Sequence, residues 1–142
     1  MQVMIQLAFN GQCRAAFGYY AKVLHGEIRV MNSLGATQDI PLPPGSKSGK
    51  PELIHFAQLA IGDQMLQGND VPVADFEEMR GFNVALHVND AAEARRIVDE
   101  FALEGEINTP LSDVAWSSAF GIVRDKFGVP WLILATDKPR QS

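Results

Sequence analysis

The chain has 142 residues, of which 46% are hydrophobic and 20% are charged, and its formal net charge is −5. This length and composition predict one globular domain, residues 1–142, with a sizeable core. The acidic balance argues against nucleic acid as a partner, because phosphate binding requires a clustered basic surface. No apolar run approaches the ~18 residues of a membrane helix, so we expect no membrane partner.

Residues 1–70 are predicted to form a first βαβββ module. A strand whose residues alternate in hydrophobicity ends near Phe9, and a helix with an apolar stripe follows. A further strand is expected over residues 27–33, and a hairpin turns at Gly62-Asp63. Between them lies a segment rich in proline and glycine, residues 34–52, which is either a lid or disordered.

The second half of the sequence repeats this plan. Residues 7–28 align with residues 86–107 at a shift of 79 without a gap, and seven of the positions are identical. Residues 71–80 are therefore interpreted as a linker, residues 81–136 as the second module and residues 137–142 as a polar tail. Such an internal repeat is the first feature to establish in a sequence, because missing it misassigns the fold.

The ends of the two helices also repeat. Gly26 and Gly105 occupy equivalent positions where a helix is expected to stop. Asp90 and Glu93 have the spacing of an N-terminal capping box on the second helix. The order βαβββ, given twice, predicts the α+β class, with two tandem modules forming a curved mixed sheet that encloses a cleft and the helices outside.

Three motifs carry a resemblance to a known group. These are FGYYAKVL with Tyr20 after the first strand, the stretch from Val84 to Arg95, and the hairpin from Asp125 to Trp131 with its aspartate, Phe-Gly pair and tryptophan. They resemble the vicinal oxygen chelate superfamily of glyoxalase I, extradiol dioxygenases and bleomycin resistance proteins. Within it, the chain is most similar to the PhnB-like, or glyoxalase-like, branch.

The resemblance implies a divalent metal held on the sheet face away from the helices. Its ligands would be His, Gln or Glu side chains from the first and fourth strands of each half. Those positions carry Asn83, Leu66, Leu132 and either Met4 or Ile5. Such residues cannot form a site that needs three or more converging His, Cys or carboxylate groups, so we predict no metal and no cofactor.

The metal would return to consideration only if the strand register differed by one residue and brought Gln6, Gln67 and His87 together. A methyl donor is not expected either, because the sequence has no glycine-rich nucleotide-binding turn.

The histidines leave alternatives open. His25 is expected at the surface near the end of the first helix. His55 either faces the cleft or caps the start of its strand. His87 lies on the same strand face as Asn83 and is either a cleft acid/base or a hydrogen-bonded structural residue.

Two tryptophans and the single cysteine are also ambiguous. Trp116 either walls a pocket or belongs to the core, whereas Trp131 is expected in the core. Cys13 is expected to be a small core or surface residue rather than an activated thiol. One cysteine excludes an intramolecular disulfide, and the N-terminus lacks the pattern of a signal peptide, so we expect a cytoplasmic protein.

The favoured hypothesis is a metal-free protein that binds a small organic ligand and forms a homodimer. Whether the modules pair within one chain or swap between subunits stays open. The alternatives are an enzyme that uses His87 or His55 as a general base and a metal-dependent lyase or dioxygenase. The candidate residues of the cleft are Met4, Gln6, His55, Leu66, Gln67, Asn83, His87, Trp116 and Leu132.

Overall fold

The same order of elements occurs twice along the chain in the computed structural model, which describes residues 1–33 and 53–138. The chain divides into unit one, Met1–Glu77, and unit two, Glu78–Ser142, and each is described by itself. The segment expected as a lid or disorder, 34–52, lies outside the described residues, as do residues 139–142. No helix in the described parts is long and apolar enough to cross a membrane.

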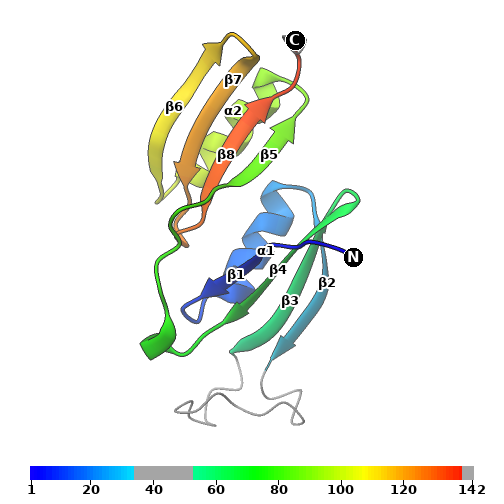
Figure 1. Cartoon of the computed structure of the whole chain (residues 1–142), viewed down its shortest axis with the longest axis vertical. Coiled ribbons are helices and arrows are strands. Elements are labelled where there is room, and N and C mark those ends of the chain that lie inside the picture. Colours follow the sequence, from blue (N-terminus) through cyan, green and yellow to red (C-terminus); the bar gives the residue numbers. More distant parts are fainter. Residues whose placement is uncertain (34–52, 139–142) are drawn as a thin grey trace. The chain divides into compact units, whose positions relative to one another are not determined.

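Each unit contains one helix and one four-stranded mixed sheet (Figure 1). The elements of unit one are β1 (Gln6–Phe9), α1 (Cys13–Val23), β2 (Glu27–Ser33), β3 (Ile54–Ile61), β4 (Gln64–Asp70) and a short 3-10 helix, η1 (Val73–Asp75). Those of unit two are β5 (Val84–Val88), α2 (Ala91–Ala102), β6 (Glu106–Val114), β7 (Ser117–Arg124) and β8 (Pro130–Ala135). The α+β class and the two tandem βαβββ modules are therefore confirmed.

The two sheets have the same topology. Their strand orders are β1-β4-β3-β2 and β5-β8-β7-β6, and in each the first strand runs parallel to the fourth while the other neighbours are antiparallel. Even an irregularity is repeated: the pairing register shifts between Ile28 and Val30 in β2 and between Ile107 and Thr109 in β6. These positions are related by the same shift of 79, so the repeat extends to the backbone.

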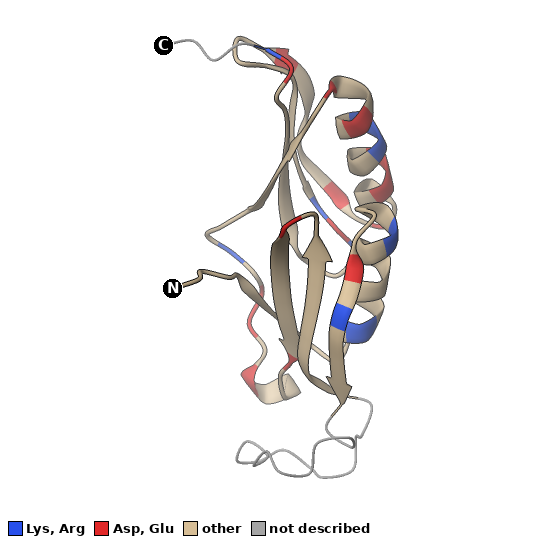
Figure 2. Ribbon diagram, turned by 90° about the vertical axis from the view of Figure 1, so that its right-hand side faces the viewer, with Lys and Arg blue, Asp and Glu red and all other residues tan. Residues whose placement is uncertain are grey.

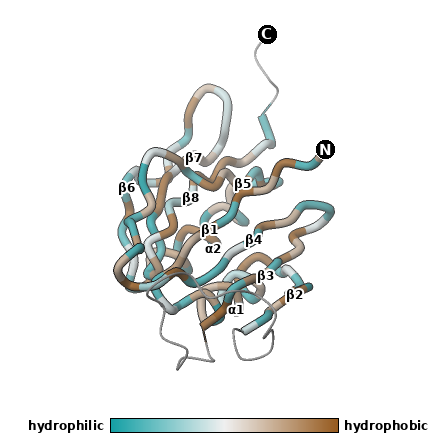
Figure 3. The backbone as a smooth tube through the Cα atoms, turned by 60° about the horizontal axis from the view of Figure 1, so that its bottom comes forward, coloured by the Kyte–Doolittle hydropathy of each residue, from teal (hydrophilic) through white to brown (hydrophobic). Residues whose placement is uncertain are grey.

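In each unit the helix covers one face of the sheet (Figure 2). Leu7, Leu59 and Phe17 of unit one are at most 1% exposed, and they form its core where α1 meets the strands. Hydrophobic and hydrophilic residues follow one another along the strands (Figure 3), as expected when successive side chains point to opposite faces. We call the side of each sheet away from its helix the helix-free face.

The helix ends differ from the expectation in one respect. The residues with left-handed backbone are His25 (φ 54°) and Glu104 (φ 59°), each one position before the predicted glycine stop. Gly105 is needed for a different reason, because a Cβ atom there would lie 2.4 Å from the carbonyl oxygens of Arg124 and Phe101. At Gly26 it would lie 2.7 Å from the carbonyl oxygen of Ala60. The glycines thus permit close backbone approach after the helix has turned.

The two helices begin in different ways. Asp90 caps α2 by accepting a hydrogen bond from the Glu93 amide at 2.9 Å, which confirms the predicted spacing. α1 has no such local cap. Instead the carboxylate of Asp70, at the end of β4, accepts bonds from the amides of Cys13 and Ile54, each at 2.9 Å. One side chain therefore joins the start of α1 to β3 and β4.

The hairpin between β7 and β8 is organised by a buried carboxylate. Asp125 is 3% exposed and accepts hydrogen bonds from the amides of Phe127 (2.8 Å) and Val129 (3.1 Å) and from the indole Nε1 of Trp131 (2.8 Å). Trp131 is fully buried and stacks on Phe101 at 4.8 Å between ring centroids. This confirms the core position expected for Trp131 and gives the aspartate of the hairpin motif a structural role.

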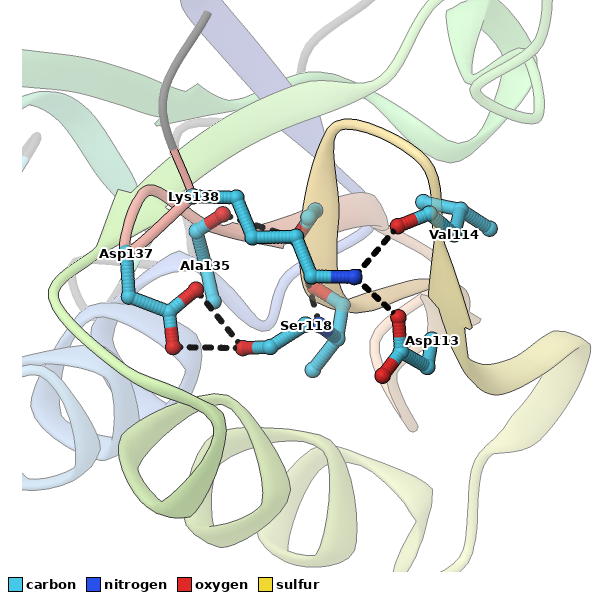
Figure 4. Close-up of polar contacts among 8 residues, drawn as sticks. Asp113, Val114, Ser118, Ala135, Asp137 and Lys138 are labelled. Atoms are coloured by element: carbon cyan, nitrogen blue, oxygen red, sulfur yellow. Dashed lines mark hydrogen bonds and ion pairs between the residues drawn. The ribbon is translucent and has the colours of Figure 1, made fainter.

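The chain after β8 is held against the hairpin between β6 and β7 (Figure 4). The Ser118 hydroxyl lies 2.6 and 2.7 Å from the two carboxylate oxygens of Asp137. The Lys138 ammonium group pairs with Asp113 and donates to the carbonyl of Val114 at 2.8 Å. The first two residues of the predicted tail, 137–142, are therefore anchored to this hairpin.

Replacing Asp125 with alanine should lower the free energy of unfolding by about 3 kcal/mol, because three buried donors would lose a charged acceptor. Urea denaturation followed by tryptophan fluorescence measures the change. Asp63→Ala is the matched control, since Asp63 lies exposed in the other hairpin turn and should change stability by less than about 0.5 kcal/mol. Equal effects of the two variants would contradict the structural role of Asp125.

Two glycines should respond in opposite directions to alanine. Gly105→Ala should destabilise unit two, because the new methyl group would overlap two carbonyl oxygens. Gly18→Ala should stabilise the protein by about 1 kcal/mol, because Gly18 lies in α1 with nothing within 4 Å of the added carbon. Thermal unfolding of both variants tests this. A stable Gly105→Ala protein would show that the close approach is not required.

Native Cys13 should resist alkylation at pH 8. The residue is fully buried, and its burial, followed by the nearby charge of Asp70, raises the pKa of the thiol to about 12. The folded protein thus favours the neutral thiol. The stability that this pKa shift contributes is present below the ordinary thiol pKa and is lost as pH rises towards 12, because the unfolded chain loses its thiol proton first. Iodoacetamide labelling with and without urea measures this. Rapid labelling of the folded chain would contradict it.

Candidate functional site

Three glutamines lie side by side on the helix-free face of unit one. Gln6 of β1 is the register partner of Gln67 of β4, and Gln67 is also the partner of Gln58 of β3. Residues paired in this way point to the same face of a sheet. We call Gln6, Gln58 and Gln67 the glutamine rung.

Two members of the rung, Gln6 and Gln67, are joined by a hydrogen bond between their side chains, and a second bond extends to Asn69. Gln67 Nε2 donates to Gln6 Oε1 at 2.8 Å, and Gln6 Nε2 donates to Asn69 Oδ1 at 3.2 Å. Asn69 lies two residues beyond Gln67 in β4 and so shares its face. The result is a short chain of uncharged amide groups in which Gln67 donates, Gln6 accepts and donates, and Asn69 accepts.

The equivalent rung of unit two is apolar. Ala85 of β5 pairs with Leu132 of β8, and Leu132 pairs with Ile122 of β7. Ala85 matches Gln6 by the repeat, and Leu132 and Ile122 match Gln67 and Gln58 by strand pairing. Two sheets of the same topology therefore present opposite chemistry at the same place.

Leu66 requires a correction. It is 8% exposed and pairs with the fully buried Leu59, so it faces α1 and belongs to the core of unit one. Gly68, on the same side of β4, lies against Phe17 of α1. Residue 67, not residue 66, is thus the counterpart of Leu132. The expected alignment of the fourth strand was displaced by one residue.

The histidines occupy three different settings. His87 is exposed in β5, alternates with the helix-facing Leu86 and Val88, and pairs with Leu134. His55 is half-buried near the start of β3, where the pairing skips from Ile54 to Phe56. His25 is exposed at the end of α1, as expected. Only His87 lies in a regular strand position on a helix-free face.

Met4 and Asn83 each come before the first strand of their unit. They are equivalent under the shift of 79, and each lies two residues before a helix-free-face position, Gln6 or Ala85. Met4 is half-buried and Asn83 is exposed. Neither side chain is a strong metal ligand.

Trp116 is 55% exposed in the turn between β6 and β7, so it is not a core residue. Its ring meets Phe120 edge-on, with 6.2 Å between centroids. Phe120 lies two residues from Ile122 in β7 and so shares the helix-free face. These rings give one end of that face an aromatic surface.

The side chains at the expected ligand positions do not suit the divalent metal that the superfamily resemblance implies. No group of three His, Cys, Asp or Glu side chains in the described parts of the chain is placed to hold a metal ion. At the first- and fourth-strand positions, unit one offers the neutral amides of Gln6 and Gln67, and unit two offers the aliphatic Ala85 and Leu132. A metal site of this kind needs anionic or imidazole ligands beside any glutamine, and none of these four positions supplies one.

Sequence reasoning identified Gln6 and Gln67 but missed Gln58 and Asn69. The missed residues were detectable in part, since Gln58 alternates with the buried Ala57 and Leu59 in β3. What the sequence lacked was the register that aligns β3, β4 and β1.

A family model described as 3-demethylubiquinone-9 3-methyltransferase matches residues 1–134. The chain is 30% identical over 138 residues to Protein YjdN of Escherichia coli (strain K12), with 89% of this chain and 90% of that protein covered.

Solved structures agree with this match. Protein PA1353 from Pseudomonas aeruginosa is 32% identical, with a TM-score of 0.83 over 95% of this chain and 97% of that one. A putative 3-demethylubiquinone-9 3-methyltransferase, PhnB protein, from Bacillus cereus shares the fold at 20% identity and a TM-score of 0.78, covering 95% and 99%. A glyoxylase/bleomycin resistance protein/dioxygenase domain from Frankia sp. EAN1pec shares the fold at 13% identity and a TM-score of 0.62, covering 96% and 97%. The chain belongs to the family described as 3-demethylubiquinone-9 3-methyltransferase.

Proposed function

We propose that this protein binds a small organic ligand without a metal, as a member of the glyoxalase/bleomycin-resistance type. The observation that carries the proposal is the pairing of Gln6 with Gln67 where the superfamily would place metal ligands. These amides hydrogen-bond to each other. They offer a polar surface for an organic molecule but no charge to neutralise a cation.

The chemistry of the two helix-free faces supports this proposal. The face of unit one carries amides, and that of unit two carries the aliphatic Leu132 and Ile122 with the aromatic Trp116 and Phe120. Polar groups that orient a ligand and apolar walls are both typical of surfaces that bind small molecules. We therefore propose each helix-free face, taken by itself, as a candidate ligand-binding surface, with Met4, Asn83, His87 and His55 as further candidates.

A metal-dependent lyase or dioxygenase is the second candidate, and one observation favours it. The fourth-strand residue on the helix-free face is Gln67, one position after the expected Leu66, and Gln67 pairs with Gln6. The sequence hypothesis named His87 of unit two as a third ligand. We rank this candidate lower because unit one itself offers only two neutral amides at these positions, and Gln6 Oε1 already accepts a hydrogen bond from Gln67.

Acid/base catalysis without a metal is a third possibility. His87, exposed on β5, or His55 would act as the general base. Among residues 1–33 and 53–138, no carboxylate hydrogen-bonds to His87 to orient its ring, and such a carboxylate is the usual partner of a catalytic imidazole. Methyl transfer, which the family description names, gains no support from this chain, since the sequence has no glycine-rich turn for a nucleotide-containing donor.

We further propose that the protein acts as a cytoplasmic homodimer. The proposal rests on the likeness to the superfamily and on the single buried cysteine, which suits a reducing compartment. Light scattering of the purified chain would measure its mass; a monomer at micromolar concentration would contradict the dimer.

Metal titration should leave the protein unchanged. The untagged chain is assayed for bound metal, and its Tm is followed with Ni²⁺, Zn²⁺, Mn²⁺, Fe²⁺ and EDTA. A ligand present at 100 times its Kd adds about 2.7 kcal/mol of stability, which is a rise in Tm of roughly 10 °C for a chain of this size. We expect no bound metal and no such rise.

A variant separates the two candidate functions. Gln67→Leu removes one donor of the suggested metal set and puts in unit one the residue that unit two carries at Leu132. Stoichiometric metal in the parent chain that is lost in this variant would sink the metal-free proposal and establish the lyase or dioxygenase alternative.

A further inference from the structure

The fold itself does not require the glutamine rung. Unit two builds the same four-stranded topology with Ala85, Leu132 and Ile122 at the matching positions. Aliphatic side chains there would be at least as compatible with a β-sheet as glutamine, which has no special strand preference. Three adjacent amides in unit one therefore call for an explanation other than sheet formation.

The amides are arranged so that the chain of hydrogen bonds has two open ends. Gln6 uses both its oxygen and its nitrogen, whereas Gln67 uses its nitrogen and Asn69 uses its oxygen. Among the described residues, Gln67 Oε1 has no donor and Asn69 Nδ2 has no acceptor. An acceptor and a donor are thus left available on one strand face, two residues apart in β4.

The register partners of these amides are uncharged. The third member of the rung, Gln58, pairs with Val30 in β2, and Asn69 pairs with Ala8 in β1. Neither an anion nor a cation would find an opposite charge at these positions, and an unpaired charge is costly to remove from water. A neutral polar group has no such cost and can pair with both open ends.

We infer that the glutamine rung with Asn69 recognises an uncharged ligand group that carries a hydrogen-bond donor beside an acceptor, such as a carboxamide, a lactam or the edge of a nucleobase. The inference rests on the proposed ligand-binding function and specifies its polar contact. Carboxamides pair with such groups through two hydrogen bonds, because each amide has a carbonyl oxygen and an NH₂ group.

The test uses the full ¹⁵N-labelled chain and five probes. Uracil and 2-pyrrolidone are neutral with adjacent donors and acceptors, acetate and methylphosphonate are anions, and indole is mainly apolar. Side-chain NH₂ signals of glutamine and asparagine are followed by NMR during titration. We expect the two neutral polar probes to shift the signals of Gln58, Gln67 and Asn69 in a saturable way, with weaker or no response to the anions.

The variants are matched to the structure. Gln67→Leu should weaken binding of uracil about tenfold, since one or two hydrogen bonds are lost. A triple variant reproduces in unit one the residues that unit two carries at the same places: Gln6→Ala, Gln58→Ile and Gln67→Leu. It should abolish the NMR response to the neutral polar probes. Gln64→Leu is the control, because Gln64 is an exposed residue of the same strand outside the rung, and it should bind as the parent does.

The outcomes separate the inference from the proposed function. Stronger binding of an anion at the rung, or undiminished uracil binding by Gln67→Leu, would overturn the inference. Saturable binding of indole in unit two, with no response to uracil or 2-pyrrolidone, would also overturn the inference. The proposed function of binding a small organic ligand would survive that result. If none of the five probes binds saturably to either unit, both the inference and the proposed function fail.

Discussion

The parallel pairing of the first strand with the fourth is the constraint on which the rest of each unit depends. In unit one it sets Gln6 opposite Gln67, and in unit two it sets Ala85 opposite Leu132. Because side chains alternate between faces, this single register decides every residue on the helix-free face and every residue beneath the helix. A shift by one position would bury the amides against α1 and expose Leu66.

Several polar side chains inside the units stabilise the elements that this register brings together. Asp70 joins the start of α1 to the strands, and Asp125 closes the last hairpin around Trp131. Ser117 is fully buried, with its hydroxyl 2.7 Å from the carbonyl oxygen of Ala135. These side chains are satisfied inside the units, as buried polar groups generally are. The aspartate and tryptophan by which the family is recognised in sequence are therefore marks of its fold.

The chemical difference between the units arises at positions where either a polar or an apolar side chain is compatible with the fold. Core positions such as Leu59 and Val123 stay apolar in both units, because the helix must bury them. On the helix-free face, Gln58 and Ile122 occupy the same place with different chemistry. The same fold can therefore carry a polar helix-free face in one unit and an apolar one in the other.

The sequence by itself determined the repeat, the βαβββ order, the α+β class, the family and the core position of Trp131, because these follow from local periodicity and motifs. It also identified Gln6 and Gln67 as candidates. Only the tertiary structure decided that Gln67, rather than Leu66, lies on the helix-free face, with Gln58 and Asn69 beside it. It also decided that His25 and Glu104 adopt the left-handed conformation before the glycines. The physical reason is that alternation assigns a residue to one of two faces, whereas the hydrogen bonds between distant strands set which residues meet.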